Sequence, residues 1–153
     1  MILQAAHRLM AASVKWVMPK DPDLVLEYKY EYTLPSRHWD KRCKAIGAKY
    51  PLFDSEEDFV AKIKAASIEP LTSSMRVENL TDYESIEDVK DLVSQYQFPR
   101  DVDRIVKGYE AGGSMPMPII IRGKKGSWIL SGNTRTNLAF ILKIPVKAIW
   151  VDG

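Results

Sequence analysis

The chain has 153 residues, which is enough for one domain with a sizeable hydrophobic core. Its net charge of +2 gives no strong electrostatic case for nucleic acid as a partner, and its single cysteine, Cys43, excludes an internal disulfide. No apolar run approaches the ~18 residues that a membrane-spanning helix needs. Composition and charge therefore favour a globular protein of a reducing cytoplasm, with no membrane contact.

The first two predicted elements are a helix and a strand. Residues 1–17 place apolar and polar side chains on different faces of a helix, and His7 and Arg8 interrupt the apolar region that a signal peptide needs. Residues 24–34 alternate Leu and Tyr with polar residues, which predicts a long half-exposed strand. Its tyrosine row has two interpretations, a face packed on the core or a partner, and a platform for stacking nucleic-acid bases.

The next stretch, 37–49, is locally basic and is interleaved with aromatic residues, Trp39 and the adjoining Tyr50. A solvated helix face and a nucleic-acid contact both fit this composition. His38 and Cys43 have no further Cys or His near them in sequence, so no metal site is predicted.

A helix is predicted to begin at Asp54 or Ser55, because three acidic residues follow in what would be its first turn. A short strand is then expected over 68–72. This strand carries Glu69 near its exit, and Arg76 lies in the polar loop beyond it.

The C-terminal half contains two further predicted helices, over 85–96 and 100–111, each with an apolar stripe at helical spacing. Two β-branched or aromatic runs, 118–122 and 127–130, are separated by Gly-Lys-Lys-Gly, which predicts a hairpin. The alternating run 146–151 predicts a final strand.

Between the hairpin and the final strand, a helix opens at Ser131-Gly132-Asn133-Thr134-Arg135. Ser131 and Asn133 are both suitable cap residues. A helix N-terminus behind a glycine turn binds anions well, and Gly132 lets a phosphate approach the backbone while Arg135 can clamp it and Thr134 offers a hydroxyl. The other interpretation is that Ser131 and Asn133 only cap the helix and Arg135 only covers the surface.

A hairpin, then Gly-x-x-Arg opening a helix, then a strand, resembles the ParB/sulfiredoxin-like fold over about residues 66–152. The resemblance implies a single α+β domain with a small mixed sheet and surrounding helices, on which residues 1–65 pack as an N-terminal addition. At the motif, Asn133 stands where sulfiredoxins carry the reducing cysteine, which argues against sulfinic-acid reduction. Thr134 replaces an arginine of the partition ParB proteins, whereas Gly132, Thr134 and Arg135 match the free serine kinase branch.

This resemblance implies a nucleotide site, with a nucleoside di- or triphosphate and Mg²⁺ held at residues 131–135. It implies nucleotide hydrolysis, phosphotransfer or nuclease chemistry, with Glu69 as catalytic base and Arg135 stabilising phosphate charge. Arg76 would neutralise further charge, because the loop that carries it should approach the Gly132 turn.

A non-catalytic module is the alternative. It would bind DNA or a protein, including a second copy of this chain as a homodimer, through the basic 37–49 segment or the tyrosine-rich 24–34 strand. The two hypotheses make different structural predictions. An enzyme requires Glu69 and Arg135 to converge on one cleft. A module requires exposed aromatic residues amid positive charge, with Arg135 bound to a structural carboxylate.

Overall fold

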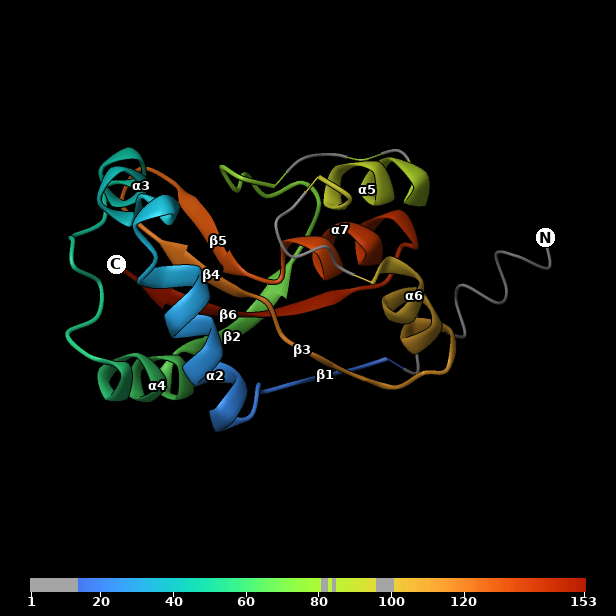
Figure 1. Ribbon diagram of the computed structural model, residues 1–153, viewed down its shortest axis with the longest axis horizontal. Coiled ribbons are helices and arrows are strands. Elements are labelled where there is room, and N and C mark those ends of the chain that lie inside the picture. Colours follow the sequence, from blue (N-terminus) through green and yellow to red (C-terminus); the bar gives the residue numbers. More distant parts are fainter. Residues whose placement is uncertain (1–13, 81–82, 84, 96–100) are drawn as a thin grey trace.

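The computed structural model describes residues 14–80, 83, 85–95 and 101–153. The fold is a mixed α+β arrangement (Figure 1). Its strands are β1 (Lys15–Val17), β2 (Ser67–Leu71), β3 (Ser114–Pro116), β4 (Ile119–Arg122), β5 (Ser127–Ser131) and β6 (Val146–Asp152). Its helices are α2 (Asp21–Glu27), a π-helical continuation η1 (Tyr28–Tyr32), a 3₁₀ turn η2 (Pro35–Arg37), α3 (Trp39–Ile46), α4 (Glu56–Ala65), α5 (Ile86–Val93), α6 (Val102–Glu110) and α7 (Asn133–Ile141).

The main sheet has four strands in the order β2-β6-β4-β5. β4 pairs antiparallel with β5 and parallel with β6, and β2 pairs antiparallel with the other side of β6. β1 and β3 form a separate parallel pair. The predicted hairpin, the strand expected over 68–72 and the final strand are therefore confirmed, and the small mixed sheet is as expected.

Helices cover both faces of this sheet. Successive side chains of β4 point to opposite sides, so this strand contributes to a core on each face. Ile119 and Ile121 of β4 pack into one core with α2, α3 and α4. Ile120 packs into the other core with α5, α6 and α7 (Figure 1). Residues of the N-terminal part thus form one of the two layers that bury the sheet.

Three helices of the described part begin at a side-chain cap, and the first of these caps, Ser55, is one of the two predicted positions. Ser55 accepts a 3.0 Å hydrogen bond from the amide of Asp58 at the start of α4. Ser85 accepts from Asp88 at the start of α5, and Asp101 accepts from Arg104 at the start of α6. The predicted end of the first of these C-terminal helices at residue 96, and the predicted start of the second at residue 100, lie outside the described residues.

The prediction of a helix over residues 1–17 is wrong where it can be compared, and residues 1–13 lie outside the described part. Lys15–Val17 is extended and pairs with Ser114–Pro116. Trp16 stabilises this extended segment through tertiary contacts. Its indole Nε1 donates to the carbonyl of Pro145 at 2.7 Å, and its ring centroid lies 6.1 Å from that of Tyr109. These are tertiary contacts that helical spacing does not reveal.

The predicted strand over 24–34 is also wrong, because this stretch is helical. Leu24, Tyr28 and Tyr32 face inward at a spacing of four, and Leu24 and Tyr32 are buried. A residue type repeated at every second position also recurs at every fourth, so the alternation fits a helix face as well as a strand face. Tyr30 points outward and is 41% exposed, so the tyrosines do not form one platform.

The basic stretch 37–49 forms helix α3 with a solvated face, as one of its two interpretations expected. Trp39, Cys43 and Ile46 are buried, whereas the lysines of the helix are exposed. The Arg42 guanidinium lies between two indole rings, 5.1 Å from the centroid of Trp39 and 5.1 Å from that of Trp128. This cation–π contact joins α3 to β5.

Candidate functional site

The turn between β5 and α7 has a geometry that only glycine accommodates. Gly132 has φ +96°, in the left-handed region. A Cβ at this position would also lie 2.8 Å from Cβ of Pro118 and 2.8 Å from Cζ of Arg135. The glycine is therefore needed for the backbone conformation and for the close approach of two neighbours.

The predicted caps of this helix are wrong. Gly132 is the N-cap and makes no side-chain capping bond, since Ser131 belongs to β5 and Asn133 is the first helical residue. Within the described part of the chain, no hydrogen bond reaches the amides of Asn133 and Thr134. The first turn contains no acidic residue. The first-turn amides of a helix carry the positive end of its dipole, which favours anions.

The guanidinium of Arg135 is hydrogen-bonded to backbone carbonyls. Its Nε donates to the carbonyl of Pro116 at 2.7 Å, and one Nη donates to the carbonyl of Met117 at 3.2 Å. On the other side, the hydroxyl of Tyr109 donates to the carbonyl of Arg135 at 2.6 Å. Burial raises the pKa of Tyr109, so this hydroxyl stays protonated and donates. Hydrogen bonds of the Arg135 side chain and of its backbone carbonyl therefore fix the first turn of α7.

The loop after β2 does approach the Gly132 turn, as predicted, but through Asn79 rather than Arg76. The Asn133 side chain donates to the carbonyl of Asn79 at 2.7 Å. Asn79 also exchanges two hydrogen bonds with the backbone of Ile129, at 3.0 and 2.8 Å. Sequence analysis did not single out Asn79, and an asparagine within an irregular loop gives little signal of its own. The side chain of Arg76 is 85% exposed and pairs with Glu78 at 3.3 Å.

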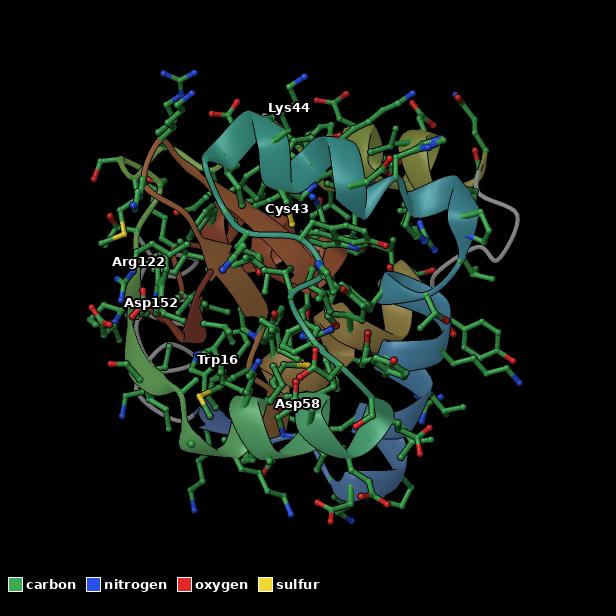
Figure 2. The ribbon with its side chains drawn as sticks, turned by 90° about the vertical axis from the view of Figure 1, so that its left-hand side faces the viewer. Trp16, Cys43, Lys44, Asp58, Arg122 and Asp152 are labelled. Atoms are coloured by element: carbon green, nitrogen blue, oxygen red, sulfur yellow. The ribbon has the colours of Figure 1, made fainter. Side chains whose placement is uncertain are left out.

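Glu69 takes part in a different cluster. Its carboxylate lies 3.2 Å from Nη2 of Arg122, whose Nε lies 2.8 Å from Asp152 (Figure 2). The hydrogen bond from Arg122 is the main cause that lowers the pKa of Glu69 below its ordinary value. Arg122 is the last residue of β4, whereas Arg135 is bound to the residues that precede that strand. The structure therefore gives Glu69 and Arg135 separate partners and does not join them in one cleft.

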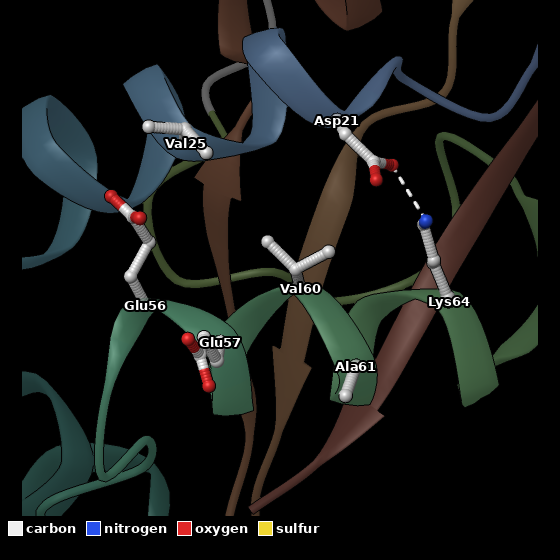
Figure 3. A pocket seen from close by; sticks show the side chains of 7 residues that line it. All are labelled: Asp21, Val25, Glu56, Glu57, Val60, Ala61 and Lys64. Atoms are coloured by element: carbon white, nitrogen blue, oxygen red, sulfur yellow. Dashed lines mark ion pairs between the residues drawn. The ribbon is translucent and has the colours of Figure 1, made fainter.

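A pocket lies on the face of the sheet that α2 and α4 cover. This open groove of about 430 Å³ lies between α2 and α4, and it has Val25, Val60 and Ala61 as apolar lining (Figure 3). Asp21 and Lys64 close one end with a 2.6 Å ion pair, and Glu56 and Glu57 add carboxylates. None of the residues predicted for the nucleotide site lines it.

Among the described residues, no group of three or more His, Cys, Asp or Glu side chains is arranged to hold a metal ion. Cys43 is buried in the core, and burial raises the pKa of its thiol to about 11. No helix of the described part is both long and apolar enough to cross a bilayer.

Comparison with known proteins gives no family assignment, because no family model, no curated protein and no solved structure matches the chain. Conclusions about function therefore rest on the chain itself.

Proposed function

We propose that this protein is a nucleotide-binding domain of ParB/sulfiredoxin-like type, which holds phosphate groups at the N-terminus of α7. The observation that carries the proposal is the position of Arg135. Its guanidinium carbon lies 2.8 Å from where a Cβ of Gly132 would be, at the residue that caps α7. Backbone amides, helix dipole and guanidinium charge thus meet at one turn, which is the combination that binds phosphate.

The hydrogen bonds of Arg135 support this role. The acceptors at Pro116 and Met117 are backbone carbonyls, which orient the guanidinium at this turn. Thr134 follows Asn133 in the first turn and would add a hydroxyl contact. Magnesium would be bound mainly through the phosphates of the nucleotide, as in proteins that offer few carboxylate ligands.

Phosphoryl chemistry is the second part of the proposal. A preorganised positive turn stabilises the charge on a transferred phosphoryl group, and such electrostatic stabilisation supplies most of the rate acceleration in phosphoryl transfer. Glu69 is not the base in this proposal, because Arg122 holds it in an ion pair and lowers its pKa. Binding is therefore tested before turnover.

The test is a thermal-shift titration with ATP, ADP, CTP and GTP in the presence of Mg²⁺. A bound nucleotide at about 100 times its Kd should raise Tm by roughly 5 °C or more. Arg135→Gln should remove the shift, since glutamine keeps an amide donor for the carbonyls but carries no charge. Arg104→Gln is the matched control, because Arg104 lies in the first turn of α6.

A second variant distinguishes loss of nucleotide binding from loss of folding. Thr134→Glu places a carboxylate at the helix N-terminus, where it stabilises the helix but repels phosphate. Loss of the shift in this variant at an unchanged ligand-free Tm would support the site. Absence of a shift with all four nucleotides, or an undiminished shift in Arg135→Gln, would overturn the proposal. A positive result leads to an assay for release of inorganic phosphate.

A further inference from the structure

The tip of the β4–β5 hairpin packs against the C-terminal end of α3. The amide of Lys125 donates to the carbonyl of Ile46 at 2.8 Å, and the amide of Lys124 donates to that of Gly47 at 3.3 Å. A Cβ on Gly123 would collide with the Ile46 carbonyl oxygen, so glycine permits this approach. Two segments far apart in sequence therefore form one surface.

This contact gathers exposed lysines from α3, from the residues after it and from the hairpin. The basic surface consists of Lys41, Lys44, Lys49, Lys124 and Lys125. Within the described part of the chain, none of the five forms an ion pair, whereas Lys62, Lys64 and Lys90 each pair with a carboxylate. Asp40 is the one acidic residue of α3 itself. The surface therefore carries a local excess of positive charge.

Acidic residues gather elsewhere, on α2 and α4. These helices carry Asp21, Asp23, Glu56, Glu57 and Asp58 in their first turns. Figure 2 shows Lys44 on α3 in the upper part of the view and Asp58 on α4 in the lower part. A chain with a net charge of only +2 is thus polarised, and a polarised surface attracts a charged partner over a distance.

The basic surface is rigid and has an aromatic neighbour. Arg42 lies between Trp39 and Trp128, which fixes α3 to the hairpin strand β5. Tyr50 directly follows Lys49 and is 53% exposed. An exposed ring beside lysines gives a base a surface on which to stack.

We propose that the basic surface binds the phosphate backbone of nucleic acid without sequence specificity. Lysine ammonium groups act as point charges toward phosphate, and the surface presents no arginine fork that would read base edges. This binding site lies on different residues from the α7 turn. The inference goes beyond nucleotide binding and does not depend on it.

The test measures fluorescence anisotropy of a labelled single strand and a labelled duplex, each of roughly 20 nucleotides per strand, across about 50 to 200 mM salt. Replacing both hairpin lysines, Lys124→Gln with Lys125→Gln, should weaken binding about tenfold and reduce the slope of log K against log salt by about 2. The control replaces Lys107 and Lys147 by Gln, which removes the same charge from exposed positions of α6 and β6.

A loss confined to the hairpin variant supports the basic surface. No binding by the wild-type chain, or equal losses in both double variants, would overturn it. Competition by poly-glutamate at the same charge concentration as the oligonucleotide would show that the surface prefers acidic protein, which also overturns the proposal. Arg135→Gln should leave oligonucleotide binding unchanged, and the hairpin variant should leave any nucleotide-dependent Tm shift unchanged, so the two proposals fail independently.

Discussion

The hydroxyl of Tyr109 in α6 donates a 2.6 Å hydrogen bond to the backbone carbonyl of Arg135 in α7. Tyr109 is fully buried, and its part-buried hydrogen bond couples the two helices at the candidate phosphate turn. The same arginine binds the chain between β3 and β4. Arg135 therefore contributes to the fold as well as to the proposed site, and variants must separate the two roles.

Tyr109→Phe should keep the ring packing and lose the hydrogen bond. We expect the free energy of unfolding to fall by about 1–2 kcal/mol, since the Tyr109 donor is buried. Urea denaturation followed by tryptophan fluorescence measures the change. Tyr30→Phe is the control, because Tyr30 is an exposed residue of η1 and should change stability by less than about 0.5 kcal/mol. Equal effects of the two changes would contradict a specific role for the Tyr109 hydroxyl.

Gly132→Ala should be strongly destabilising. The left-handed backbone costs a non-glycine residue about 1–2 kcal/mol, and the crowding of the new Cβ by Pro118 adds about 1–3 kcal/mol. Thermal or urea unfolding gives the value. Gly113→Ala is the matched control, because a Cβ there meets its nearest atom at 3.5 Å, an ordinary contact. A Gly132 variant as stable as the Gly113 variant would show that the turn relaxes.

The Glu69–Arg122 pair should make stability depend on pH at acidic values. Since Arg122 lowers the folded-state pKa of Glu69, the unfolded chain binds a proton more readily than the folded chain. The contribution is present above the unfolded pKa of about 4.3 and is lost as pH falls through the lower folded value.

Glu69→Gln should accordingly lose less stability than the wild-type chain between neutral pH and about pH 3.5. Urea midpoints across this range measure it, with Glu110→Gln at the exposed end of α6 as control. An identical acid loss in Glu69→Gln and in the wild-type chain would mean that the pair contributes nothing.

Cys43 should react slowly with a thiol reagent in the native state. The residue is buried, and its pKa is raised to about 11, so thiolate is scarce and inaccessible near neutral pH. The rate of reaction with an aromatic disulfide should rise steeply with urea, in parallel with unfolding. A fast rate in the absence of urea would show that α3 opens locally.

Much of the fold could be predicted from local patterns. The β-branched run before Gly-Lys-Lys-Gly predicted the β4–β5 hairpin, and Ser55 predicted the start of α4, because turns and caps depend on a few neighbouring residues. The alternation over 24–34 was misread because spacings of two and four coincide in it. Lys15–Val17 became a strand through its pairing with β3, which the local sequence does not encode.

The sequence by itself therefore determined the start of α4, the β4–β5 hairpin, the strand β6 and the glycine turn before α7, since those features follow from short-range sterics and hydrogen bonding. Only the tertiary structure decided the partners of each charged side chain. It paired Glu69 with Arg122, fixed Arg135 to Pro116 and Met117, and brought Lys124 and Lys125 to the end of α3. Long side chains take the partners that packing brings within reach, and packing is a property of the whole fold.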